Sequence, residues 1–269
     1  GLDLLFEESR KLDKESVIFM MQALCKVGLN SVSGNRPDIV GANKQLRMFG
    51  VDKLSVVVAS NIGRVGTLWE VASALLYQVA SHPRATVRRY GMDCLTPLII
   101  SAFKHRAELN KQASDGEGLG EDSEADRQFD SDLERRLLAS YEELYRCQWA
   151  DTKNNVLDGL YQVLQSCGEE VKAAWPMVLA MLKGVAQDME SQQVQQAFLC
   201  LKLIRNDFLS ALPIECLQLL LTTIGAFGLA DADLNISLTA ITLLWNIADF
   251  FGRERGALLA AFSEVGFHP

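Results

Sequence analysis

The stretch from residue 234 to 250 constrains the fold most strongly, because it is apolar around most of a helical circumference. Two apolar stripes recur there at helical spacing, and only a narrow polar stripe separates them. A helix of this kind must be covered by neighbours on both sides, which stacked helix pairs provide. The first stripe is Leu234, Leu238, Ile241, Trp245 and Ala248, the second is Ile236, Ala240, Leu243, Ile247 and Phe250, and the polar stripe is Asn235, Thr239, Thr242, Asn246 and Asp249.

Similar helices recur along the chain. The small residues Gly91, Gly159, Ala197 and Ala240 are each followed by an apolar residue one and four positions later. The last three are 38 and 43 residues apart, close to the HEAT/armadillo repeat length of roughly 40–47 residues. We therefore predict an all-α fold, an α-solenoid of HEAT/armadillo-like helix pairs.

Apolar periodicity and helix-breaking residues predict about five helix pairs, in which 1–269 is a single helical-repeat segment of a larger protein. His82 and Pro83 are expected to end one helix, and Pro97 is expected to kink the next. A break near Gly50 is also possible on this pattern. The expected helices cover about 14–30, 43–62, 67–81, 84–104, 129–147, 152–166, 169–185, 191–208, 213–227 and 233–252.

The composition changes sharply between residues 114 and 126, which contain six acidic residues, three glycines and no basic residue. This composition predicts an acidic flexible loop inserted into the array. An acidic segment that binds a partner is the alternative. Removing the insertion and its flanks shortens the first repeat spacing from 68 residues to about 40.

The charge balance argues against some classes of partner. The formal net charge is −8 and the pI is near 5.0, whereas nucleic-acid backbones and anionic membrane surfaces attract clustered lysine and arginine. We expect no nucleic-acid partner, and membrane association that is indirect or uses other regions. No apolar run is expected to approach the ~18 residues of a spanning helix.

No motif in the sequence indicates catalysis. There is no G-x-S-x-G, P-loop or H-E-x-x-H pattern, and the six cysteines are widely spaced without a C-x-x-C pair. We expect reduced core thiols in a cytosolic protein, with no metal, no cofactor and no catalytic residue. The chain is therefore predicted not to be an enzyme.

Two features could contact protein partners. Arg84, Arg88 and Arg89 form a small basic cluster, for which the alternative is a solvated helix face or pairing with nearby acids. The polar stripe of residues 235–249 could line a concave binding surface, or instead form hydrogen bonds between repeats. Core packing is expected for all four tryptophans, Trp69, Trp149, Trp175 and Trp245.

The run LNISLTAITLLWNIAD, from Leu234 to Asp249, resembles a segment of the Mon-two family, large Golgi scaffolds related to the Sec-seven Arf exchange factors. The resemblance extends over most of the chain, except for the acidic insertion. It is also carried by Asp3–Phe6, Ala23–Cys25, Leu68–Pro83, Trp175–Pro176, Ala197–Leu203, Asn206–Leu209, Cys216–Leu219 and Phe227–Leu229.

The resemblance implies a middle region of a long protein that lacks the exchange domain. It implies a peripheral location on trans-Golgi and early endosome membranes. It also implies partners such as a Dopey-type protein, an Arf-like GTPase and a flippase complex. The expected function is a non-catalytic scaffold or adaptor in Golgi–endosome trafficking. A regulatory segment of a large Arf guanine-nucleotide exchange factor is the main alternative, and a cargo-carrying transport receptor is a third.

Overall fold

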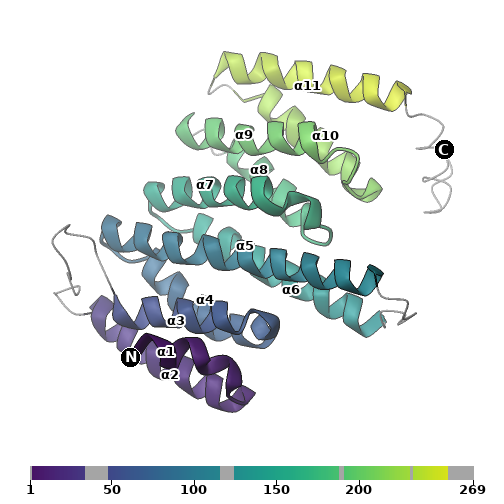
Figure 1. The fold of residues 1–269 in the computed structure, drawn as a ribbon. Coiled ribbons are helices and arrows are strands. Elements are labelled where there is room, and N and C mark those ends of the chain that lie inside the picture. The colour runs from purple at the N-terminus through teal and green to yellow at the C-terminus, as the bar shows by residue number, and fades with distance from the viewer. Residues whose placement is uncertain (1, 34–47, 116–123, 188–190, 231–232, 254–269) are drawn as a thin grey trace. The chain divides into compact units, whose positions relative to one another are not determined.

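The computed structural model describes residues 2–33, 48–115, 124–187, 191–230 and 233–253 (Figure 1). Every regular element in these ranges is a helix, either an α-helix or a short 3₁₀ helix. The prediction of an all-α fold is confirmed at this level. The chain divides into two compact units, Gly1–Glu170 and Val171–Pro269, which are described separately below. The prediction of one continuous repeat segment stays a prediction.

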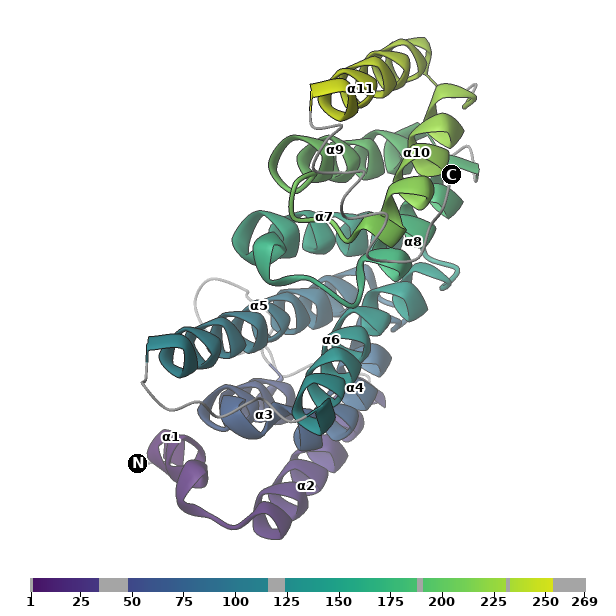
Figure 2. The same cartoon turned by 90° about the vertical axis from the view of Figure 1, so that its right-hand side faces the viewer.

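The first unit consists of three helix pairs preceded by a short helix. Figure 2 shows α2, α4 and α6 in one layer and α3, α5 and α7 in a second layer, while α1 and η1 contact α3. Each helix of a pair packs on its partner and on the neighbouring pair. The elements are α1 (Leu2–Glu7), η1 (Glu8–Lys11), α2 (Lys14–Ser33), α3 (Phe49–Ser60), η2 (Ile62–Arg64), α4 (Val65–Ala80), α5 (Ala85–Asp115), α6 (Glu124–Tyr145), α7 (Ala150–Cys167) and η3 (Gly168–Glu170).

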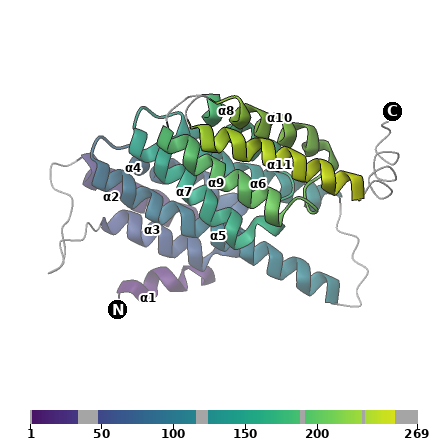
Figure 3. The ribbon, with the colours of Figure 1, turned by 90° about the horizontal axis from the view of Figure 1, so that it is seen from above.

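The second unit contains two helix pairs. Here α8 packs on α9 and α10, while α10 packs on α11. Helices α9 and α11 lie side by side in Figures 1 and 3 and are in contact. The elements are α8 (Trp175–Gln187), α9 (Ser191–Asp207), η4 (Ile214–Cys216), α10 (Leu217–Gly228) and α11 (Leu234–Arg253).

Close helix contacts depend on residues without bulky side chains. A Cβ on Gly91 of α5 would lie 2.6 Å from the backbone nitrogen of Ala80 in α4. A Cβ on Gly50 of α3 would lie 2.4 Å from the backbone nitrogen of Gly28 in α2. Gly50 lies in the first turn of α3 and permits a close helix crossing, and the extended residue Met48 precedes this helix, so α3 begins beside the expected break near Gly50. Residues 43–47 of the expected helix lie outside the described part of the chain. The small residues at positions 91, 159, 197 and 240 are all buried.

Several helix boundaries differ from the sequence prediction, and two of the differences have a clear physical reason. Helix α5 continues about eleven residues past the expected end at residue 104, because its polar end pairs with α6. Arg106 Nε lies 3.4 Å from Asp130 Oδ1, and Arg106 Nη1 lies 3.8 Å from Glu134 Oε2. Helix α8 begins at Trp175 and not near residue 169, since Pro176 is tolerated only in the first turn of a helix.

Both ends of the predicted acidic loop are helical. Helix α5 extends to Asp115 and α6 begins at Glu124, so the two ends of the predicted range 114–126 are helical. The remaining residues, 116–123, lie outside the described part of the chain.

The tryptophans do not all lie in the core. Trp69 and Trp175 are buried, and Trp69 Nε1 donates a 3.1 Å hydrogen bond to the Arg136 carbonyl, which links α4 to α6. Trp149 is half-buried, and its Nε1 donates to the Ser81 carbonyl. The prediction of core packing is wrong for Trp245, whose side chain is exposed.

Candidate functional site

The two predicted apolar stripes of α11 have different environments. Ile236, Ala240, Leu243 and Ile247 of the second stripe are buried against the rest of the unit. The first stripe faces away from the described residues. Its exposed fractions are 74% for Leu234, 56% for Leu238, 47% for Ile241 and 70% for Trp245. We call this row of four large side chains the open apolar face; contiguous exposed apolar surface of this kind marks an interface.

The composition of α11 also corrects one expectation. Leu234–Arg253 is long and apolar enough to cross a membrane by length and composition, contrary to the expectation that no apolar run approaches that length. Only 22% of the apolar window is buried inside the structure. A single such helix is weak evidence of a membrane span, because a mostly buried core helix of a soluble protein also meets the criterion of length and composition.

The predicted polar stripe of α11 is accessible. Asn235, Thr239, Thr242 and Asp249 are exposed, and Asn246 is half-buried. The Thr239 hydroxyl donates a 2.7 Å hydrogen bond to the Asn235 carbonyl, and the Thr242 hydroxyl donates a 3.1 Å bond to the Leu238 carbonyl. These bonds lie within α11. A partner-binding role for the stripe stays a prediction.

The three arginines of the predicted cluster have different environments in the structure. Arg84 and Arg89 are exposed, whereas Arg88 is only 5% exposed. The Arg88 guanidinium donates to both carboxylate oxygens of Asp151 in α7 at 2.7–3.1 Å, and its carbon lies 4.3 Å from the centroid of the Trp149 ring. Its Nη1 also donates to the His82 and Pro83 carbonyls. Arg88 therefore holds α5 to α7 and cannot contribute an open basic surface, which is the acid-pairing alternative stated above.

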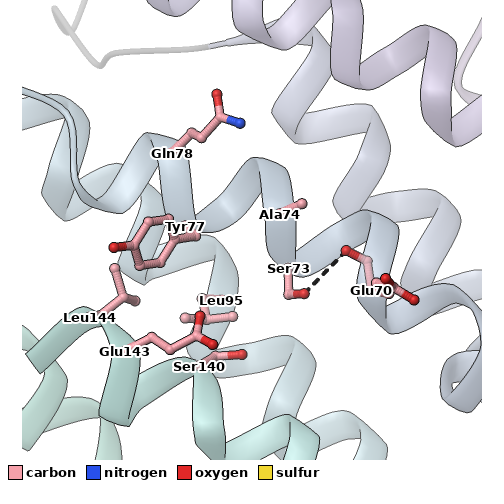
Figure 4. A pocket seen from close by; sticks show the side chains of 9 residues that line it. All are labelled: Glu70, Ser73, Ala74, Tyr77, Gln78, Leu95, Ser140, Glu143 and Leu144. Atoms are coloured by element: carbon pink, nitrogen blue, oxygen red, sulfur yellow. Dashed lines mark hydrogen bonds between the residues drawn. The ribbon is translucent and has the colours of Figure 1, made fainter. Parts of the chain in front are cut away.

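A groove that the sequence did not indicate lies in the first unit, with a volume of about 440 Å³. Figure 4 shows its lining side chains, which come from α4, α5 and α6. Leu95 and Leu144 are its buried apolar residues, and Glu70, Tyr77 and Glu143 are exposed around it. The remaining lining residues are Ser73, Ala74, Gln78 and Ser140.

The groove is acidic at its rim. Within the described residues, neither Glu70 nor Glu143 has a lysine or arginine within ion-pair distance. Two carboxylates beside an apolar floor fit a lysine or arginine side chain, whose stem is apolar and whose end is charged. Sequence reasoning missed the groove because its residues come from three helices and share no contiguous motif.

The cysteines of the described residues are free thiols in structural positions. Burial raises the pKa of the Cys94 thiol and that of the Cys167 thiol to about 12. A thiol with a raised pKa is a poor nucleophile near neutral pH, because the thiolate is the reactive form. No group of three or more potential metal-ligating side chains was found among the residues whose placement is described.

Comparison with known proteins gives a consistent picture. A family model described as "Mon2/Sec7/BIG1-like, HDS" matches residues 123–203, and one described as "C-terminal region of Mon2 protein" matches residues 206–262. A Protein MON2 homolog of Xenopus laevis is 35% identical over 252 residues, which is 93% of this chain. A Protein MON2 homolog of Homo sapiens is 32% identical over the same share.

The chain belongs to the Mon2 family. It spans 13% of the length of each of these two Mon2 relatives and therefore corresponds to a small region of them. The Brefeldin A-inhibited guanine nucleotide-exchange protein 1 of Arabidopsis thaliana is 22% identical over 87% of the chain and 13% of its own length. No solved structure matches the chain.

Proposed function

We propose that this chain is a non-catalytic scaffold or adaptor segment of a Mon2-family protein, acting through protein–protein contacts in Golgi–endosome membrane trafficking. The similarity to MON2 homologues over more than nine tenths of the chain carries the proposal. The helix pairs add physical support, because they present extended surfaces for other proteins. On this proposal the protein is cytoplasmic and peripheral on trans-Golgi and early endosome membranes.

The proposal includes the repeat type. Each unit is built of helix pairs, and the second helix of each pair, from α5 onward, buries a small residue at the repeated position. These observations favour a HEAT/armadillo-like α-solenoid. Such arrays expose long rows of side chains, and the polar stripe of α11 is one such row.

Three surfaces are candidates for partner binding. These are the polar stripe of α11, the exposed pair Arg84 and Arg89, and the acidic groove between α4 and α6. A Dopey-type protein, an Arf-like GTPase or a flippase complex is the proposed partner, on the family resemblance alone. The membrane is reached indirectly, through those partners or through other regions of the protein.

The second candidate function is a regulatory helical segment of a large Arf guanine-nucleotide exchange factor. The similarity to the Arabidopsis exchange protein favours it. The full-length sequence separates the two. An exchange domain in the same polypeptide supports the regulatory segment, and its absence supports the scaffold.

The scaffold proposal is tested by crosslinking mass spectrometry of the full-length protein purified with its bound partners. We expect crosslinks from lysines of this segment, such as Lys153 and Lys183, to a second protein. Crosslinks confined to the same polypeptide, in a sample where other regions crosslink to partners, would show that this segment is not a partner-binding part of the scaffold.

A further inference from the structure

The second unit contains two equivalent helices with different degrees of cover. Ala197 of α9 and Ala240 of α11 occupy the same repeat position, and both are fully buried. One position later, Phe198 of α9 is 4% exposed, whereas Ile241 of α11 is 47% exposed. Four positions after the alanine, Leu201 is buried and Leu244 is only half-buried. The same face of the repeat is therefore closed in α9 and open in α11.

The following helix pair closes this face in α9. The Phe198 ring lies 5.4 Å from the Phe227 ring of α10, centroid to centroid, and α11 packs beside α9. Helix α10 is the first helix of the next pair. Within the described residues, no helix occupies the corresponding position against Ile241 of α11.

The open face of α11 is also wider than the closed face of α9. The positions equivalent to Leu238 and Trp245 in α9 are Gln195 and Lys202, and the Lys202 ammonium lies over the Phe198 ring. Polar side chains therefore end the apolar surface in α9, while apolar side chains extend it in α11. The last repeat of an array carries a polar outer face, because an apolar one would be left in water. Helix α11 has the character of an internal repeat.

We propose that the open apolar face of α11 is covered by a further helix pair of the same polypeptide, whose first helix packs on Ile241 as α10 packs on Phe198. This inference rests on the proposed helix-pair array and specifies how the array continues. The interface would repeat, on α11, the α9–α10 contact already present in the unit. Ile241 would take the place that Phe198 has in α9, and Trp245 would extend the apolar contact beyond it, as an aromatic residue of the kind enriched among the strongest contributors to binding.

The test places a photo-crosslinking residue, p-benzoylphenylalanine, at Trp245 in the full-length protein. The matched control places it at Leu199, an exposed apolar residue on a different face of α9. We expect the Trp245 position to crosslink to residues that follow α11 in the same polypeptide, and the Leu199 position not to. Mixing light and heavy isotope-labelled protein distinguishes crosslinks within one chain from crosslinks between two copies.

A crosslink from Trp245 to a second copy, a crosslink to a different protein, or no protein crosslink would each overturn the inference. A second measurement uses Trp245→Lys with Leu199→Lys as its control, followed by hydrogen exchange of the full-length protein. We expect at least tenfold faster exchange in α11 and in the crosslinked segment for Trp245→Lys alone. Equal exchange in both variants would also overturn the inference.

The outcomes separate this inference from the scaffold proposal. A crosslink from Trp245 to a different protein would overturn the inference and leave the scaffold proposal standing. A crosslink within the chain, together with no contact between this segment and any partner, would support the inference and contradict the scaffold proposal. If Trp245→Lys does not fold, the crosslinking experiment alone tests the inference, because p-benzoylphenylalanine keeps an aromatic side chain at position 245.

Discussion

The Arg88 guanidinium of α5 and the Asp151 carboxylate of α7 form a forked ion pair, with Nη2 at 2.8 Å from Oδ1 and 2.7 Å from Oδ2. The two residues are 63 positions apart in the sequence. Arginine is suited to this role because its planar fork matches a carboxylate and stacks on an aromatic ring, here Trp149. The pair joins two helix pairs of the first unit.

Replacing Arg88 by alanine is expected to destabilise the chain by about 2–4 kcal/mol, because it removes a nearly buried charge and leaves two backbone carbonyls without their donor. Arg84→Ala is the matched control, since Arg84 is exposed, and should change stability by less than about 0.5 kcal/mol. Urea unfolding measures both. Equal stability of the two variants would contradict the structural role of Arg88.

Gly91→Ala is expected to destabilise the chain by about 1–3 kcal/mol, because the added methyl would overlap the α4 backbone at Ala80. Gly184→Ala in α8 and Gly225→Ala in α10 are the controls, since a Cβ at either position meets nothing within 4 Å. Both controls should stabilise by about 0.5–1 kcal/mol, because alanine favours a helix over glycine. If thermal unfolding shows that all three substitutions change stability in the same direction, the close α4–α5 contact is refuted.

Stability is expected to fall as the pH rises above about 9. Burial raises the pKa of Cys94 and that of Cys167 to about 12, so the unfolded chain loses these protons at lower pH than the folded chain. The unfolded state binds fewer protons between pH 9 and 12, and the free energy of unfolding therefore decreases with pH.

Urea unfolding in reducing buffer at pH 8 and pH 10 tests this pH dependence. The variant Cys94→Ala/Cys167→Ala should show a smaller decrease between the two pH values than the unaltered chain. Cys147→Ala, at a half-buried position, serves as the control for loss of a thiol. If the double variant loses as much stability between pH 8 and pH 10 as the unaltered chain, the pH dependence arises from other groups.

Apolar periodicity predicted the helices well because packing of an apolar face stabilises most helices. It placed the end of α5 too early, since residues such as Arg106 are held by ion pairs with α6 and not by apolar contacts. The partner of such a residue lies far away in the sequence, so local pattern gives no signal for it. The extension of α5 could be predicted only with the fold known.

The candidate surfaces show the same limit. Sequence reasoning could not decide whether Arg88 pairs with an acid, because its partner Asp151 lies in another helix, 63 positions away. Trp245 was placed in a core because of its stripe, yet a stripe specifies which residues share a face and not whether a neighbour covers it. The polar stripe of α11 was predictable because it lies on one continuous helix.

The pair of substitutions Asn246→Ala and Asp249→Arg tests the polar stripe as a binding surface. Asp249 is exposed and Asn246 is half-buried, so the double variant should lose less than about 1 kcal/mol of stability. Glu169→Arg, at an exposed acid of the first unit, is the control for the change of charge. We expect capture of a Dopey-type partner by the full-length protein to fall at least tenfold for the stripe variant and to stay unchanged for the control. Unchanged capture by a folded stripe variant would exclude the stripe as the binding surface. A large loss of stability in the stripe variant would instead show that the polar stripe makes contacts between repeats.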